Sequence, residues 1–134
     1  MCDATGNKGQ VLLVSRNYGM QSGLEEAVKS QGFQTVFTYG MRSADSYCVV
    51  NNGDDRTISA GEFVAAIVDD EVMSGLGVNE IIIALTALGI PCVALTSTGH
   101  DSLGSAAAGA RQVIYSRAVV DALFDQRIKL SALK

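Results

Sequence analysis

Residues 62–71 read Glu-Phe-Val-Ala-Ala-Ile-Val-Asp-Asp-Glu, and this stretch decides the fold. The run from Phe63 to Val68 is apolar without a break, which predicts a β-strand buried on both faces. Such a strand belongs in a parallel sheet that carries helices on each side. The strand leads into Asp69 and Asp70, at the carboxyl end where open parallel sheets carry their functional sites. These two aspartates are therefore the first candidate site residues.

Short apolar runs alternate with amphipathic stretches along the rest of the chain. Four more strands are predicted, over residues 11–14, 33–39, 90–95 and 112–115. Apolar residues at helical spacing predict helices over residues 20–32, 78–88, 103–110 and 119–128. This alternation in a chain of 134 residues predicts an α/β fold. The expected architecture is a flavodoxin-like, doubly wound, five-stranded parallel sheet in the order 2-1-3-4-5, with helices on both faces.

Length and composition predict one domain over residues 1–134, with residues 1–9 as a flexible N-terminus. Apolar residues make up 48% of the chain. No apolar run reaches the roughly 20 residues of a membrane span, so we expect no membrane contact. The first residues lack a signal-peptide pattern, which predicts a cytoplasmic protein. The 10 basic and 14 acidic residues give a net charge of −4 without any basic run, which argues against direct nucleic-acid binding.

Cysteine and histidine content limits the chemistry further. Cys2, Cys48 and Cys92 form an odd set without CxxC spacing, and His100 is the only histidine. A structural zinc site and a disulfide framework are both excluded on these numbers, and no metal site is predicted. His100 lies in a polar loop that leads into a helix, where an exposed histidine is expected.

Residues 40–61 do not follow the alternation of strands and helices and are expected to form an irregular insert. Ser43 can cap a short helix through Val50, with residues 51–55 as its exit loop. Alternatively, the Asn-Gly pair at 52–53 can turn a hairpin between Tyr47–Val50 and Arg56–Ile58. We favour the short helix.

Three stretches carry a family resemblance. They are Val11-Leu12-Leu13-Val14-Ser15-Arg16-Asn17, Phe63-Val64-Ala65-Ala66-Ile67-Val68-Asp69 and Ile90-Pro91-Cys92-Val93-Ala94-Leu95-Thr96. Together with Gly32 and with Gly109-Ala110 before Val113-Ile114, they resemble the receiver domain of two-component response regulators. The resemblance extends from Gln10 to about Ile128 and is weakest over residues 40–61. It implies a signalling domain with the flavodoxin-like fold.

In the receiver family an aspartate at the end of the third strand accepts a phosphoryl group from a histidine kinase. The resemblance places Asp69 at that position, with Asp70 as the fallback. Gly77 lies eight residues after Asp69 and Phe63 lies six before it, which fits the family spacing for Asp69. Thr96 resembles the family's hydroxyl switch residue, and Tyr115 lies near its aromatic switch position.

The chain departs from the family where receivers bind magnesium and phosphate. Ser15 and Arg16 stand at the positions of the family's acidic pair, and Ser116 stands at the position of its lysine. Losing two carboxylates removes most of the oxygen ligands for Mg²⁺, so we expect no cofactor and regard Mg²⁺ binding as doubtful. The Arg16 guanidinium is expected to pair with Asp69 instead and to lower the pKa of its carboxyl. The chain thus resembles an atypical receiver, or pseudo-receiver.

These features predict a signalling domain, not an enzyme, that is phosphorylation-independent or weakly phosphorylated. The resemblance implies protein partners, among them a histidine kinase, or a homodimer through the family's fourth helix, fifth strand and fifth helix. The regulated output would be transcription or a similar process, and the chain can be one domain of a longer regulator. The alternative is a small-molecule sensor or enzyme in which Ser15, Asp69, Thr96 and His100 converge on a ligand at the strand ends.

Overall fold

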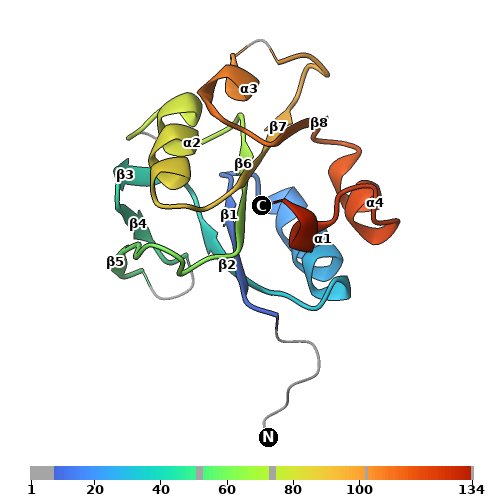
Figure 1. Cartoon of the computed structure of the whole chain (residues 1–134), viewed down its shortest axis with the longest axis horizontal. Coiled ribbons are helices and arrows are strands. Elements are labelled where there is room, and N and C mark those ends of the chain that lie inside the picture. Colours follow the sequence, from blue (N-terminus) through green and yellow to red (C-terminus); the bar gives the residue numbers. More distant parts are fainter. Residues whose placement is uncertain (1–7, 51–52, 73–74, 102, 134) are drawn as a thin grey trace, which may run out of the picture.

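The computed structural model describes residues 8–50, 53–72, 75–101 and 103–133, and a five-stranded parallel sheet forms its centre (Figure 1). The strands lie in the order β2-β1-β6-β7-β8, and every neighbouring pair is parallel. With the small strands β3 to β5 set aside, this is the predicted order 2-1-3-4-5, so the flavodoxin-like architecture is confirmed. The bounds are β1 Gln10–Val14, β2 Gln34–Thr38, β6 Ala65–Asp69, β7 Cys92–Thr96 and β8 Gln112–Tyr115.

The helices cover the two faces of this sheet and give the domain two apolar cores (Figure 1). One face carries α1 and α4, and the other carries α2 and α3. Their bounds are α1 Tyr18–Ser30, α2 Val78–Ala87, α3 Ser105–Ala108 and α4 Val119–Phe124. No helix in the described part of the chain is long and apolar enough to cross a membrane.

The unbroken apolar strands serve both cores at once. In β1, Val11 and Leu13 pack into the cluster with α1 and α4, whereas Leu12 and Val14 pack into the cluster with α2. Successive side chains of a strand point to opposite faces of the sheet, so a strand covered on both sides must be apolar at every position. Strand β6 follows the same rule and is buried along its whole length.

The short helix favoured for residues 43–50 is wrong. The chain there forms a separate three-stranded antiparallel sheet of β3 (Met41–Ser43), β4 (Ser46–Cys48) and β5 (Asp55–Thr57). The pairing of β4 with β5 is close to the hairpin alternative, although Asn52 of the predicted Asn-Gly turn lies outside the described residues.

Burial explains why strands form in this region. Met41, Tyr47 and Ile58 are at most 3% exposed and pack into the core on the α2 side. The Tyr47 ring meets Phe63 edge-on, with the ring centroids 5.9 Å apart. Ser46 and Cys48 are only partly buried, so the segment has one buried side chain between two partly exposed ones. That alternation fits a strand.

Helix α3 is shorter than predicted. The expected helix over residues 103–110 is reduced to one turn, because Gly104 and Gly109 flank it with left-handed φ angles of 73° and 116°. Leu103 therefore lies outside the helix and is exposed.

The last helix is also shorter than predicted and ends at Phe124 instead of reaching Ile128. Gln126 adopts a left-handed φ of 61° just beyond it, which ends the helix in the way a glycine commonly does. Ile128 is still buried, and its N–H donates to Ala122 O, so the chain folds back over the end of α4. It then enters a short 3-10 helix, η1 (Leu130–Ala132).

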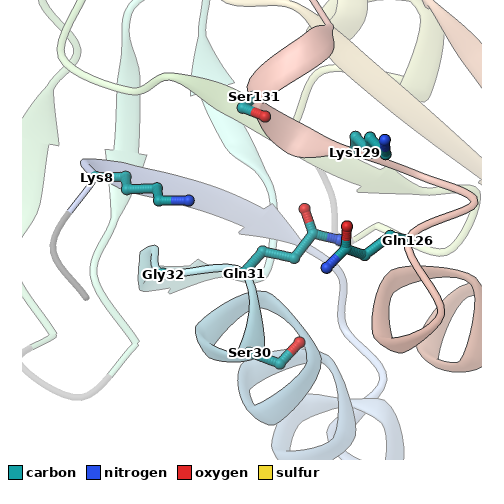
Figure 2. Close-up of a pocket in the computed structure, with 7 residues that line it drawn as sticks. All are labelled: Lys8, Ser30, Gln31, Gly32, Gln126, Lys129 and Ser131. Atoms are coloured by element: carbon teal, nitrogen blue, oxygen red, sulfur yellow. The ribbon is translucent and has the colours of Figure 1, made fainter. Parts of the chain in front are cut away.

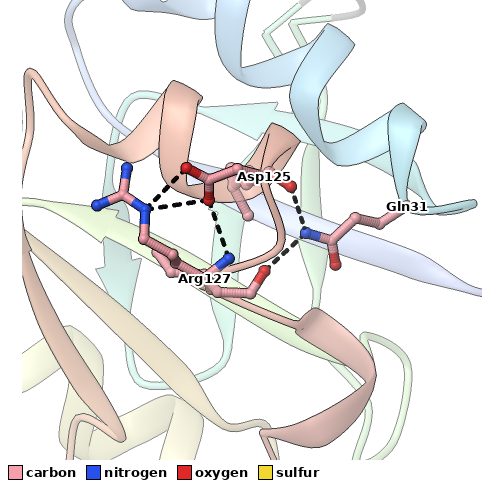
Figure 3. A network of polar contacts seen from close by, with 5 residues as sticks. Gln31, Asp125 and Arg127 are labelled. Atoms are coloured by element: carbon pink, nitrogen blue, oxygen red, sulfur yellow. Dashed lines mark hydrogen bonds and ion pairs between the residues drawn. The ribbon is translucent and has the colours of Figure 1, made fainter.

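Gln31 fastens this C-terminal segment to the end of α1 (Figure 3). Its Nε2 donates to Leu123 O at 2.8 Å and to Ile128 O at 2.7 Å, and its Oε1 accepts from the N–H of Leu130 at 2.9 Å. One side chain thus satisfies three backbone groups that lie more than 90 residues away. Beside it, Asp125 and Arg127 form an exposed ion pair at 2.8 Å.

At the other end of the chain, residues 1–7 of the predicted flexible N-terminus lie outside the described residues. Lys8 and Gly9 already belong to the fold. The N–H of Lys8 donates to Gly32 O at 2.8 Å, and Gly9 O accepts from the N–H of Gln34 at 2.9 Å.

Candidate functional site

The carboxyl ends of the central strands bring the predicted site residues to one edge of the sheet. Val14 pairs in register with Val68, so Ser15 follows β1 beside Asp69, the last residue of β6. Thr96 ends β7 in register with Tyr115, which ends β8. The parallel arrangement therefore gathers side chains that are up to 100 residues apart in sequence.

Asp69 is the most deeply placed carboxyl of this edge. It is 2% exposed, and its Oδ2 accepts a hydrogen bond from Ser15 Oγ at 2.8 Å. Ser15 Oγ in turn accepts from the N–H of Asn17 at 3.0 Å, which fixes the hydroxyl at the start of α1. The N–H of Glu71 donates to the other Asp69 oxygen at 3.4 Å. Asp69 is therefore held within the chain by neutral donors.

The surroundings of Asp69 favour its protonated form. Burial raises the pKa of Asp69 to about 6, because the charged carboxylate loses most of its hydration. The hydrogen bond from Ser15 lowers this pKa, and the neighbouring Asp70 carboxyl raises it again. Of these influences, burial is the largest.

Asp70 lies beside Asp69 and ties the end of β6 to the loop after β7. Its Oδ2 accepts from the N–H of Ser97 at 2.7 Å and from Ser97 Oγ at 2.9 Å. Its Oδ1 is buried and has no hydrogen-bonding partner within the described residues. The two carboxyls thus have different partners. Asp69 is bonded to Ser15 at the end of β1, whereas Asp70 is bonded to Ser97 in the loop after β7.

The expected ion pair between Arg16 and Asp69 is not present. The Arg16 side chain is exposed and forms no ion pair with Asp69 in the described structure, although its backbone N–H donates to Glu71 O at 3.1 Å. The predicted lowering of the Asp69 pKa is wrong as well, because burial dominates and the pKa is raised.

Thr96 is buried but turned toward its own loop. It is 6% exposed, and its Oγ1 donates to the backbone oxygen of His100 at 2.7 Å and bonds Thr98 Oγ1 at 3.0 Å. His100 enters this arrangement through its backbone, and the residue is exposed. Ser15 and Asp69 therefore meet, whereas Thr96 and His100 are joined to each other and not to that pair.

Tyr115 and Ser116 lie at the edge strand β8. The Tyr115 side chain is half-buried, and the Arg117 guanidinium lies 5.9 Å from the centre of its ring. Ser116 donates its backbone N–H to Thr96 O at 2.9 Å, which continues the ladder between β7 and β8. At the lysine position of the family, the chain therefore contributes a backbone bond and a short hydroxyl side chain.

Sequence reasoning missed two partners at this site. Ser97, which binds Asp70, follows Thr96 directly and could have been found as a hydroxyl at a strand end. Ser15 was named at a missing-acid position of the receiver pattern and as one of four side chains that could converge on a ligand, but not as the hydrogen-bond partner of Asp69. The alternation of β1 places Ser15 on the same side of the sheet as Leu13, and that of β6 places Asp69 on the same side as Ile67. That signal predicts contact of Asp69 with Ser15 and not with Arg16.

The donor set at this edge does not fit a magnesium ion of the kind the resemblance implies. Mg²⁺ requires near-octahedral oxygen ligation with carboxylates available to it. Ser15 Oγ is engaged with Asp69 and Asn17, and Asp70 Oδ2 is engaged with Ser97. Asp70 Oδ1 has no partner within the described residues, but it is buried and is a single oxygen, and Arg16 offers a cation where the family has an acid. The described residues contain no group of three His, Cys, Asp or Glu side chains that could hold a metal. We therefore derive no step through a metal ion.

No protein-family model and no curated protein matches the chain. Solved structures resemble it in fold. A response regulator from Thermotoga maritima is 17% identical with a TM-score of 0.65, and the match covers 94% of this chain and 99% of that chain. The receiver domain of a sensor histidine kinase from Pseudomonas aeruginosa PAO1, with magnesium in its active-site cleft, is 18% identical with a TM-score of 0.63. That match covers 90% of this chain and 97% of the other.

A third similar structure shows that this fold also occurs under a different description. A protein from Burkholderia pseudomallei, described as pilus assembly-related, is 19% identical with a TM-score of 0.59. The match covers 100% of this chain and 99% of that chain. At these identities the likenesses establish the receiver-domain fold, and function has to be argued from the site.

Proposed function

We propose that this chain is a receiver-like signalling domain, not an enzyme, that works through protein contact and does not need phosphorylation. The observation that carries the proposal is the hydrogen bond from Ser15 Oγ to Asp69 Oδ2 at 2.8 Å. In place of a second carboxylate, the end of β1 supplies a neutral donor. The chain's own hydroxyl group thereby holds the Asp69 carboxyl in place. This supports a domain whose arrangement at Asp69 does not depend on a bound metal ion or a phosphoryl group.

The proposed contact surface consists of α3, β8 and α4. Strand β8 is an edge of the sheet, so one side of it has no neighbouring strand. Phe124 on α4 is 51% exposed and Leu103 before α3 is 46% exposed. Exposed aromatic and aliphatic side chains, and a guanidinium over an aromatic ring such as Arg117 over Tyr115, are typical of protein interfaces. A second copy of the chain, or a protein partner such as a histidine kinase, would dock here and set an output such as transcription.

Short contacts connect the Asp69 edge with this surface. Asp70 binds Ser97 in the loop after β7, and the preceding Thr96 pairs in register with Tyr115 of β8. A change of charge at the two aspartates would therefore reach the loop after β7 and the edge strand through direct neighbours. Switching domains use this kind of local charge change to bias two arrangements of a surface.

The experiment is an amide NMR titration of the whole chain with beryllofluoride and Mg²⁺, and separately with acetyl phosphate, at millimolar concentrations. We expect no specific shifts at Asp69, Asp70 and Ser97 in the wild type, as in the matched Asp69→Asn variant. Saturable shifts that appear in the wild type and vanish in Asp69→Asn would overturn the phosphorylation-independent proposal.

The contact surface is tested separately by light scattering after size-exclusion chromatography. We expect the wild type to form a dimer, or to bind its partner, and Phe124→Ser to weaken that association. Phe124→Ser removes an exposed side chain and should leave the fold intact, whereas the buried Leu123 is unsuitable for this test. Association that is unchanged in Phe124→Ser would remove α4 from the proposed surface.

A further inference from the structure

Figure 2 shows a cavity of about 420 Å³. It lies at the opposite end of the sheet from Asp69, because Lys8 precedes β1 whereas Asp69 ends the parallel strand β6. Its wall is formed by the end of α1 at Gln31 and Gly32, and by Lys8, which precedes β1. The C-terminal segment closes it with Gln126 and Lys129, together with Ser131 of η1. The cavity thus lies between the end of α1, the residue before β1 and the C-terminal segment. It is separate from the candidate site at Asp69.

The lining of this cavity is cationic. Lys8 and Lys129 are among its lining residues, and no Asp or Glu of the described part of the chain lines it. Within the described residues neither lysine forms an ion pair, because the three ion pairs present use Lys29, Arg42 and Arg127. The chain as a whole carries a net charge of −4, so a cavity with two unpaired cations stands out from its surroundings. Such a concentration of positive charge attracts anions.

The cavity is also preformed. Gln31 holds the C-terminal segment against α1 through the two bonds that its Nε2 donates (Figure 3) and through the bond that its Oε1 accepts from the N–H of Leu130. Gln126 is the one non-glycine residue of the described chain with a positive φ, at 61°. Glycine would take this conformation at lower cost, whereas glutamine adds an amide to the cavity lining (Figure 2).

We propose that this cavity binds a small phosphate-type anion. Ammonium, amide and hydroxyl groups all donate to anionic oxygens, and two ammonium groups suit a ligand with more than one negative charge. A volume of about 420 Å³ lies within the range of small-molecule sites and exceeds what a single phosphate needs, so a diphosphate or a phosphate ester fits best. The carboxyl end of α1 carries a partial negative charge, which attracts the lysine ammonium groups and repels an anion. We therefore expect the affinity for the anion to be modest. This inference does not depend on the proposed signalling function.

Pyrophosphate is the probe for the test, in an amide NMR titration of the full chain without Mg²⁺. Sodium chloride at equal ionic strength serves as the blank. We expect saturable shifts at Gly32, Gln126 and Ser131 that sodium chloride does not produce. Shifts that do not saturate, or that gather at Asp69 instead, would overturn the proposal.

Charge-removing variants test the residues. Lys8→Ala and Lys129→Ala are each expected to weaken pyrophosphate binding about fivefold or more, since each removes one charged donor. The control is Lys29→Ala, because Lys29 lies outside the cavity and its ammonium group is 3.8 Å from Glu25. We expect its dissociation constant to stay within about twofold of the wild type. An equal loss in Lys29→Ala and in the two cavity variants would show a general charge effect and refute the site.

Discussion

Replacing Asp69 by asparagine removes a carboxyl that is only 2% exposed and whose pKa burial raises to about 6. Asparagine keeps the shape of the side chain and an oxygen that can accept from Ser15 Oγ. It cannot carry the charge that burial disfavours. The variant therefore separates the effect of ionisation at Asp69 from the effect of packing there.

The sign of the pH effect follows from the direction of this pKa shift. A carboxyl with a raised pKa binds its proton more tightly in the folded chain than in the unfolded chain, where the ordinary value is 3.8. Its contribution to stability is fully present below the unfolded pKa and is lost as the pH rises through about 6. Over the whole range the difference is about 3 kcal/mol. Between about pH 5 and about pH 7.5 it is about 1 to 2 kcal/mol.

Urea denaturation followed by circular dichroism at these two pH values measures the difference. We expect the wild type to lose about 1 to 2 kcal/mol more than Asp69→Asn between the lower and the higher pH. At the higher pH the variant should be the more stable protein. Titrating groups that do not interact with Asp69 are common to both proteins and cancel in the comparison, whereas the neighbouring Asp70 carboxyl contributes to the measured difference. Asp54→Asn, which alters an exposed carboxylate, is the control and should follow the wild type. Parallel pH dependence in the wild type and Asp69→Asn would refute the reasoning.

Three further variants test other parts of the structure. Gln31→Met removes the three bonds to the C-terminal segment, and we expect it to lower the free energy of unfolding in urea by about 2–4 kcal/mol. The exposed Gln34→Met should change it by less than about 0.5 kcal/mol, and equal losses would contradict the role of Gln31. Ser15→Asp places a second carboxylate against Asp69, so the variant should have a lower melting temperature than the wild type. Millimolar Mg²⁺ should raise the melting temperature of this variant. A melting temperature insensitive to Mg²⁺ would argue against the contact between residue 15 and Asp69. Gln126→Gly relieves the left-handed φ and should raise the free energy of unfolding by about 0.5–1 kcal/mol without added anion, whereas a loss would show that the glutamine side chain stabilises the fold.

The main sheet could be predicted from sequence because its central strands are buried on both faces. In the β1 and β6 segments nearly every position is apolar, and a run of that kind has few other solutions in a domain of this size. The strand order also follows, since short alternating units favour the doubly wound arrangement. Local sequence was sufficient for these elements because each carries its own burial signal.

The small sheet of β3, β4 and β5 could not be predicted in the same way. Its strands have three residues each, and their buried side chains, Met41 and Tyr47 with the adjoining Ile58, are far apart in sequence. Strands β3 and β4 each have one buried side chain and β5 has none, and such a pattern does not distinguish a period of 2 from one of 3.6. These side chains pack against the apolar surface around Phe63 and α2, which is formed by other parts of the chain and is not visible in the local sequence.

At the candidate site, the sequence predicted which residues lie at the strand ends but not which of them are in contact. The predicted partner of Asp69 was Arg16, whereas the partner in the structure is Ser15. Asp69 ends a central strand as expected, and both Ser15 and Arg16 follow the neighbouring strand. Charge alone favours Arg16 as the partner, whereas the side-chain alternation of β1 directs Ser15 toward Asp69. A buried carboxyl beside a hydroxyl keeps a raised pKa, but beside a guanidinium it would be held ionised. A difference of one position along the strand therefore decides whether this edge of the sheet is a fixed ion pair or a carboxyl that can still change its charge.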